Sequence, residues 1–345
     1  MTTRRPGLRR QAPNGTEPHG AGPTASSWAR RIGMIAAMLL LAATVGAQVP
    51  ARAQAAHLVA VHDLSPTESV LEVYSSAMGK VITSQVLHPP GRPAGPAVYM
   101  LPGLGGGEDG ISWINNGGAR AFFAGKTVTA VFPVGGRASM FTDWQRDDPI
   151  LGRNKWRTFL TRELPPIVNR AFHTNGVNAI TGVSMSGGPA LAIAESAPGL
   201  YRAVASYSGC PGTTDLLGVG AVTAVVTRGG GNMLNMWGPP GGPDWVANDP
   251  IVNAGKLRGT AVFLSAATGM PGPIDGGPAE TLGGLAGGGQ IEAYTRVCTA
   301  AMSNRLTALG IAHTFSARPL GSHSWGVFAA DLRASWPVIG RAIGA

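Results

Sequence analysis

Residues 178–196 read NAITGVSMSGGPALAIAES, and this stretch decides the fold. Its first part, Asn178 to Val183, has the composition of a buried strand, and Gly188 to Ser196 can form a helix. Ser184 therefore stands on a tight turn between a predicted strand and a predicted helix. Such a turn lifts a serine above the edge of a sheet, and it needs small neighbours because the backbone passes close to the adjacent strands.

The turn departs at one position from the G-x-S-x-G pattern of a nucleophilic serine. Ser186 stands at the fifth position, where the pattern has glycine, and Gly187 follows it. Serine is still small enough for a crowded turn, so Ser184 is the candidate nucleophile. Short patterns arise by chance in a chain with 51 glycines, so the assignment needs partners elsewhere in the sequence.

The alternation of strand and helix continues on both sides of this turn. Strands are predicted at residues 97–101, 127–134, 203–207, 260–265 and 312–317, and helices at 115–124, 156–172 and 290–309. Pro165 and Pro166 are expected to kink or split the second of these helices. Residues 57–84 alternate apolar and polar side chains, which is typical of antiparallel strands at a sheet edge. Residues 211–242 are rich in glycine and are predicted to be weakly structured.

Apolar strands separated by helices predict an α/β fold, with a mostly parallel central sheet and helices on both faces. Together with the serine turn, this arrangement is typical of an α/β-hydrolase. With 44% hydrophobic and 13% charged residues, the chain is far from the composition of a disordered protein. No interdomain linker stands out, so residues 54–345 are predicted to form a single catalytic domain.

The N-terminal segment accounts for most of the net charge of +9. Residues 1–53 hold seven arginines and one acidic residue, which leaves 20 basic and 17 acidic residues in the rest of the chain. That nearly neutral body argues against nucleic acid as a partner. Arginines, an apolar run at 32–47 and the small residues of Ala51-Arg52-Ala53 indicate a secretory signal. The mature protein is expected to start near Gln54 or Ala56.

Export would place the protein in a compartment where disulfides persist. The chain has two cysteines, Cys210 and Cys298, and a bridge between them is predicted. No group of side chains has a known metal-ligand spacing, so neither a metal nor a cofactor is implied.

A nucleophilic serine needs a histidine base, and the base needs a carboxylate that fixes its tautomer. In an α/β-hydrolase the chain order is serine, acid, histidine. Two histidines follow Ser184. His313 falls beside a predicted strand, whereas His323 lies in the loop after the last strand. His323 is therefore the predicted base.

The residues alone do not decide the acid. Topology favours the region after the strand at 260–265, which contains Asp275, Glu280 and Glu292. Asp275 in its loop fits the pattern as well as Glu292 on its predicted helix, so the choice stays open at this point.

The oxyanion of the intermediate needs two backbone N–H groups. Met185 follows the nucleophile and is predicted to supply one of them. The second is expected from Leu104, in the Gly-rich segment 102–107 after an early strand. A phosphate-binding loop does not fit this segment, because no Lys-Ser/Thr pair follows it.

Several longer motifs together resemble one family, the antigen 85-type mycolyltransferases and their corynebacterial relatives, which are secreted α/β-hydrolase esterases. The resemblance extends from about residue 97 to residue 332. The motifs are 133–136 (PVGG), 142–144 (TDW), 155–163 (KWRTFLTRE), 182–188 (GVSMSGG), 236–239 (MWGP), 248–250 (NDP) and 323–325 (HSW).

The resemblance implies roles for individual residues. It implies a triad of Ser184, Glu292 and His323, and so favours Glu292 over Asp275. It also matches Leu104 and Met185 to the oxyanion pair. The candidate substrate-binding residues are Gly103, Gly105 and Trp325. The mycobacterial enzymes have Asp and Arg, both in contact with trehalose, where this chain has Pro102 and Gly105.

The activity implied by the resemblance is mycolyl transfer through an acyl-enzyme on Ser184, from trehalose monomycolate to a second trehalose monomycolate or to a cell-wall sugar. The expected partners are trehalose mycolates and cell-envelope glycans, and peripheral contact with the outer lipid layer is considered as well. Two alternatives are a secreted carboxylesterase or lipase-like hydrolase and a non-enzymatic wall- or matrix-binding protein.

Overall fold

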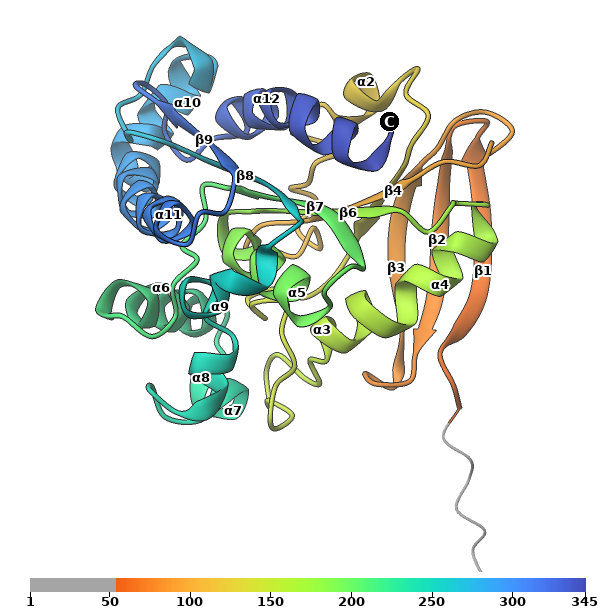
Figure 1. The fold of residues 1–345 in the computed structure, drawn as a ribbon, viewed down its shortest axis with the longest axis horizontal. Helices are drawn as coiled ribbons and strands as arrows, with labels where there is room; N and C mark the ends of the chain where they lie inside the picture. Colours follow the sequence, from red (N-terminus) through yellow and green to blue (C-terminus); the bar gives the residue numbers. More distant parts are fainter. Residues whose placement is uncertain (1–53) are drawn as a thin grey trace, which may run out of the picture. The chain divides into compact units, whose positions relative to one another are not determined.

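A nine-stranded sheet lies at the centre of residues 54–345, the part of the chain that this computed structural model describes (Figure 1). The predicted secretory signal, residues 1–53, lies outside the described residues. The strands are β1 (His57–Ser65), β2 (Glu68–Ser75), β3 (Lys80–Leu87), β4 (Ala97–Leu101), β5 (Thr129–Pro133), β6 (Asn178–Val183), β7 (Tyr201–Tyr207), β8 (Ala261–Ala267) and β9 (His313–Arg318).

The sheet is mostly parallel, as predicted. Its order is β1-β2-β3-β5-β4-β6-β7-β8-β9. The strands β1, β2 and β3 are antiparallel and form one edge, and β3 also pairs antiparallel with β5. From β5 to β9 all neighbours are parallel. Every residue of β4, β5 and β6 is buried, because helices cover both faces of these strands.

Helices cover the two faces of the sheet. They are α2 (Ala119–Phe123), α3 (Trp156–Thr158), α4 (Leu164–Ala171), α5 (Gly187–Ser196), α6 (Leu216–Arg228), α7 (Met233–Trp237), α8 (Pro243–Ala247), α9 (Pro250–Asn253), α10 (Pro278–Gly283), α11 (Gly289–Ala308) and α12 (Trp325–Ile343). The helices α2 and α12 share a hydrophobic core on one face. On the other face, α4, α5 and α11 contribute to a second core (Figure 1). None of these described helices combines the length and hydropathy of a membrane span.

The prediction of a weakly structured stretch at 211–242 is wrong. It contains α6, a 13-residue helix, and the shorter helix α7. Asp215 caps α6 by accepting a hydrogen bond from the Gly218 amide at 2.6 Å. The first twelve residues of α6 carry no charge and include two glycines, so its sequence lacks the polar face that marks a surface helix.

The predicted helix at 156–172 is split, as expected, and its last segment begins directly before the two prolines. A π-helical turn, Phe159–Glu163, separates α3 from α4. Pro165 and Pro166 lie in the first turn of α4, where an amide donor is not needed within the helix. The C-terminal helix α12 has no counterpart among the predicted elements.

Candidate active site

Ser184 lies on a sharp turn between β6 and α5. Its φ of +57° is in the left-handed region, which non-glycine residues avoid. A Cβ atom on Gly182 would lie 2.0 Å from the carbonyl oxygen of Ser186, so only glycine fits there. This geometry is that of the strand-to-helix elbow predicted from the sequence.

Ser186 has a structural role that accounts for the departure from the G-x-S-x-G pattern. Its buried hydroxyl accepts a hydrogen bond from the Val183 amide at 2.9 Å and lies 3.2 Å from the carbonyl oxygen of Leu101. Ser186 therefore ties the turn to the neighbouring strand β4. Behind the turn, a Cβ atom on Gly187 would lie 2.8 Å from the Cα of Gly209, so glycine is needed there as well.

The structure brings together the three residues of the predicted triad. His323 Nδ1 lies 2.7 Å from Glu292 Oε2, and His323 Nε2 lies 2.7 Å from Ser184 Oγ. Because a carboxylate can only accept, Nδ1 carries the proton and donates a hydrogen bond to Glu292. The Ser184 hydroxyl then donates to Nε2. This arrangement can remove the proton of Ser184 during an attack on a carbonyl carbon.

Glu292 is completely buried in the first turn of α11, and its charge is balanced by donors on both oxygens. Besides His323, it accepts hydrogen bonds from Ser208 Oγ at 2.7 Å and from the Ala267 amide at 2.7 Å. Such bonds offset the free energy that burial of a carboxylate requires. Ser208 and Ala267 lie at the carboxyl ends of β7 and β8, so the sheet itself positions the acid.

The predicted disulfide is present. Cys210, just after β7, is bonded to Cys298 on α11, with a Cα–Cα distance of 4.8 Å. The bridge ties the helix that carries Glu292 to the loop that carries Ser208. Thr299 adds a hydrogen bond to the Gly209 carbonyl at 3.0 Å in the same place.

Asp275, the alternative acid of the sequence analysis, binds the loop around His323 and not the imidazole. Its Oδ1 accepts from the amide and hydroxyl of Ser322 at 2.7 and 2.8 Å and from the hydroxyl of Ser324 at 2.7 Å. The contacts that this carboxylate makes were not predicted from the sequence, and neither was the role of Ser208. Ser208 follows β7, and Asp275 lies in the segment after β8. The carboxyl ends of these strands lie near that of β6, and this proximity in a parallel sheet could have predicted that both residues approach the site.

The Gly-rich segment after β4 passes beside the nucleophile. A Cβ atom on Gly103 would lie 3.7 Å from the Cβ of Ser184. The Leu104 carbonyl accepts from the Ala138 amide at 3.0 Å, which holds the segment in place. The backbone next to Gly103 is therefore near enough to Ser184 for the Leu104 amide to be a candidate oxyanion donor.

The remaining candidate substrate-binding residues flank this centre. The carboxylate of Asp109 fills the space beside Gly105, where a Cβ atom would lie 1.9 Å from an Asp109 oxygen. Trp325, at the start of α12, stacks edge-to-face on Trp113 with ring centroids 5.3 Å apart. Trp325 also packs on Phe328, which in turn contacts the ring of His323.

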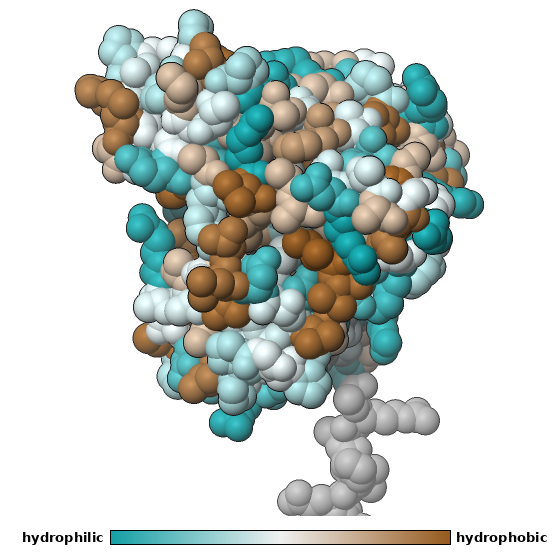
Figure 2. All heavy atoms as spheres, turned by 60° about the vertical axis from the view of Figure 1, so that its left-hand side comes forward, coloured by the Kyte–Doolittle hydropathy of each residue, from teal (hydrophilic) through white to brown (hydrophobic). Residues whose placement is uncertain are grey.

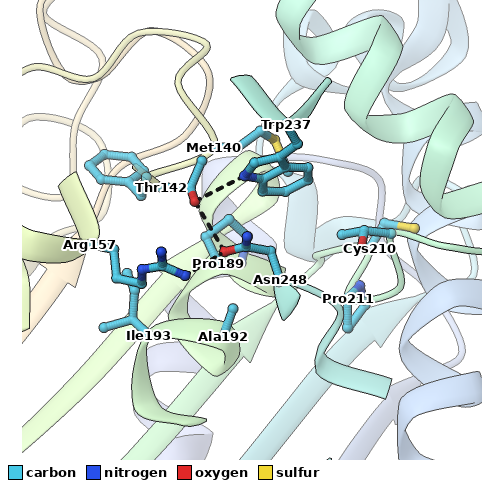
Figure 3. Close-up of a pocket in the computed structure, with 13 residues that line it drawn as sticks. Met140, Thr142, Arg157, Pro189, Ala192, Ile193, Cys210, Pro211, Trp237 and Asn248 are labelled. Atoms are coloured by element: carbon cyan, nitrogen blue, oxygen red, sulfur yellow. Dashed lines mark hydrogen bonds between the residues drawn. The ribbon is translucent and has the colours of Figure 1, made fainter. Parts of the chain in front are cut away.

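A small cavity lies beside the first turns of α5 (Figure 3). Its water-accessible volume of about 10 Å³ has room for a single water molecule. Thr142 bridges Asn248 at 3.1 Å and the Trp237 indole at 3.3 Å, and Arg157 donates to Asn248 at 3.0 Å. These four residues come from four of the motifs that carry the family resemblance, so the motifs meet here in one packing unit. Among residues 54–345, no cluster of side chains is suited to hold a metal ion.

Comparison with known proteins identifies the family of the chain. Residues 75–338 match the model of the esterase family. The diacylglycerol acyltransferase/mycolyltransferase Ag85B of Mycobacterium leprae is 33% identical over 283 residues, which are 77% of this chain and 81% of the relative. The chain belongs to the antigen 85-type mycolyltransferases, within the esterase family.

Solved structures of similar proteins have the same fold as this antigen 85-type chain. The crystal structure of MPT51 of Mycobacterium tuberculosis matches with a TM-score of 0.66 and 30% identity, covering 78% of this chain and 96% of that protein. An S-formylglutathione hydrolase from Agrobacterium tumefaciens, at 14% identity, shares the fold with a TM-score of 0.59 and covers 82% of this chain and 100% of its own. The antigen 85-type chain is thus an enzyme of the acyltransferase and esterase class with an α/β-hydrolase fold.

Proposed function

We propose that this protein transfers mycolyl groups from trehalose monomycolate to a second trehalose monomycolate or to a cell-wall sugar, through an acyl-enzyme on Ser184. The observation that carries the proposal is the unbroken chain of two 2.7 Å hydrogen bonds from Ser184 through His323 to Glu292. The named function of the relatives supports the choice of substrate.

In the first half-reaction, Ser184 Oγ attacks the ester carbonyl of the donor while His323 Nε2 takes its proton. Glu292 stays ionised and stabilises the imidazolium. The amides of Leu104 and Met185 donate to the oxyanion. The C–O bond to the sugar then breaks, and His323 returns the proton to the departing sugar oxygen, which leaves the acyl group as an ester on Ser184.

In the second half-reaction, His323 takes the proton of an acceptor hydroxyl as its oxygen attacks the ester on Ser184. The bond to Ser184 Oγ breaks, and the proton passes to that oxygen, which restores the free enzyme. The first sugar leaves before the acceptor reacts with the acyl-enzyme, so the kinetics are expected to be of the ping-pong type.

The surface near the site is suited to a lipid substrate. Apolar side chains gather on the face that includes α6, α10 and α11 (Figure 2). On α6, Leu216 is 90% exposed, and no charged residue precedes Arg228 within the helix. Tyr294 on α11 donates a hydrogen bond to the Leu217 carbonyl, which joins α6 to the helix of the acid. We propose that an acyl chain on Ser184 lies along the uncharged residues of α6.

The experiment uses trehalose monomycolate labelled in its acyl group. We expect labelled trehalose dimycolate from the wild-type protein and none from Ser184→Ala. Free mycolate without dimycolate would contradict transfer and identify a hydrolase. That second candidate is favoured by Gly105 and Pro102, which stand where the mycobacterial enzymes have sugar-contacting residues. If the Ser184→Ala variant replaced the wild-type protein in cells without loss of function, the protein would instead be a non-enzymatic wall- or matrix-binding protein.

We also propose that residues 1–53 direct export to the cell envelope and are removed. The Arg-bearing start, the apolar run and the small residues before Gln54 support this proposal. N-terminal sequencing of the protein recovered from the culture medium and envelope is expected to begin near Gln54 or Ala56. A protein that retains residue 1 would contradict it.

A further inference from the structure

Asp275 is bound to the His323 loop on both sides of the histidine. It ends a 3₁₀ turn, Pro273–Asp275, in the segment between β8 and α10, and its side chain is buried. One carboxylate oxygen accepts three hydrogen bonds from Ser322 and Ser324, at 2.7 to 2.8 Å. The other accepts from the Gly272 amide at 2.7 Å.

The bonds to Asp275 are well placed to hold the imidazole. Ser322 and Ser324 are the direct neighbours of His323, whose own amide donates to the Gly288 carbonyl at 3.2 Å. Ser324 also caps α12 by accepting from the Val327 amide. The loop is therefore fixed from two directions, by Asp275 and by the backbone before α11.

The turn and α12 pack so closely that little adjustment is available. A Cβ atom on Gly326 would lie 1.9 Å from the carbonyl oxygen of Ile274. The start of α12, directly after the His323 loop, is thus in close backbone contact with the turn that carries Asp275. If the carboxylate is removed, two buried donors on Ser322 and a partly buried one on Ser324 lose their partner, and the loop has to move to satisfy them.

The donors on Asp275 are all uncharged amides and hydroxyls. Burial raises the pKa of this carboxyl, but hydrogen bonds from Ser324, Ser322 and Gly272 outweigh it and hold the pKa below the ordinary value of 3.8. The group is thus ionised at neutral pH and acts purely as an acceptor.

We infer that Asp275 is a positioning residue for the reaction at Ser184, because it fixes the loop that aligns His323 between Ser184 and Glu292. The inference rests on the proposed function, in which His323 is the base. Asp275 occupies the region after β8 where the acid was expected, and it serves the histidine through Ser322 and Ser324.

The structure provides a matched control in Asp148, a second buried aspartate with four uncharged donors. It accepts hydrogen bonds from the amides of Ile150, Leu151 and Asn232 and from the side chain of Asn235, at 2.9 to 3.0 Å. These contacts lie in a different loop and do not involve the residues of the triad. Removing Asp148 thus removes a similar number of bonds without a direct effect on His323.

The experiment compares wild type, Asp275→Ala, Asp275→Asn and Asp148→Ala in the full mature protein. The assay is hydrolysis of p-nitrophenyl butyrate, a small ester that needs neither the sugar nor the long acyl chain. Thermal unfolding is measured in parallel, and the downfield proton resonance of the His323 Nδ1–H group is followed by NMR.

We expect kcat of Asp275→Ala to fall by about 10²-fold, as for a displaced catalytic group, with a much smaller change in KM. Its imidazole proton resonance should be lost. Asp275→Asn keeps an oxygen that can accept from Ser322 and Ser324, so it should fold and recover part of the rate. Asp148→Ala should lose stability but retain the wild-type kcat.

The inference would be overturned if Asp275→Asn and Asp275→Ala kept the wild-type kcat and the imidazole resonance, or if Asp148→Ala lost activity to the same extent. Failure of the proposed function is recognised separately. A Ser184-dependent hydrolase would still hydrolyse p-nitrophenyl butyrate but form no dimycolate, and the role of Asp275 would stand; a protein without a working Ser184 would remove the basis of the inference. In that case the wild-type protein would show no hydrolysis that depends on Ser184, as judged by the Ser184→Ala variant.

Discussion

At the residue scale, Ser184 is held in a conformation that a serine rarely adopts. Its left-handed φ is maintained because Gly182 and Gly187 allow close backbone contacts and because Ser186 ties the turn to β4. Strain of this kind persists only where the surrounding structure enforces it, and it is common at functional sites. The hydroxyl is thereby presented to His323.

The charge of Glu292 can be tested without changing its size. In Glu292→Gln, the amide would face His323 Nδ1 with its own donor and favour the wrong tautomer of the imidazole. We expect kcat for a small ester to fall by about 10⁴-fold while the protein stays folded. Steady-state kinetics with circular dichroism as the folding control provides the check, and a loss of less than tenfold would speak against the triad.

A second residue-scale prediction concerns Glu195, which is buried on α5. Burial raises its pKa to about 9, aided by the charge of Asp249 and opposed by Lys256. The folded state therefore keeps a proton that the unfolded state loses above its ordinary pKa of 4.5. The stability associated with the neutral carboxyl is complete below that pH and is lost as the pH rises towards 9.

Replacing Glu195 with Gln removes this penalty. We expect Glu195→Gln to raise the free energy of unfolding by about 3 kcal/mol at pH 7 and by little at pH 5. Urea unfolding at both pH values measures the difference, with Glu108→Gln as an exposed control. An equal effect at the two pH values would show that Glu195 does not titrate as described.

The residue scale also shows what the sequence can reveal about the site. Ser184 and His323 could be predicted because one lies in a local motif and few histidines follow it in the chain. The residues alone could not separate Glu292 from Asp275, because both lie beyond β8 and the distance to His323 depends on how two loops and α11 pack. Only the resemblance favoured Glu292.

At the element scale, the carboxyl ends of the parallel strands build the site. The segment of Leu104 follows β4, Ser184 follows β6, Ser208 follows β7, and His323 follows β9. Parallel strands bring these loops to one edge of the sheet. The acid comes from α11, whose position depends on its attachment to the sheet.

That dependence leads to a prediction for the disulfide. Cys210 and Cys298 are separated by 88 residues, and closing such a loop stabilises the fold by roughly 4 to 5 kcal/mol in the chain-entropy model. We expect the double variant Cys210→Ser/Cys298→Ser to unfold at lower urea concentration and to lose activity as α11 loosens around Glu292. Reductant should affect wild type in the same direction and leave the double variant unchanged. Equal stability of the two proteins would contradict this role.

The elements differ in how well the sequence predicts them. The strands β4 and β6 begin and end at the predicted residues. Each is a continuous apolar run followed by a sharp turn, so its boundaries are clear in the sequence. In contrast, α6 was missed because glycines and exposed apolar residues hide its periodicity. The long helix α12 begins at Trp325, the last residue of the HSW motif, and was not predicted.

At the scale of the whole molecule, the exposed apolar side chains agree with the proposed action on a lipid substrate. The chain without residues 1–53 is nearly neutral. Apolar side chains lie on one face of the described domain (Figure 2). Exposed leucines include Leu216 on α6, Leu282 on α10 and Leu285 in the turn after α10. A water-soluble sugar and a long acyl chain would both have to reach Ser184 from such a surface.

The most direct test of the central claim is mass spectrometry of the mature protein after brief exposure to trehalose monomycolate. The account predicts a mass increase of one mycolyl group, located on the peptide that contains Ser184 and missing in the Ser184→Ala variant. An adduct on any other residue, or dimycolate formation without a covalent intermediate at Ser184, would contradict it.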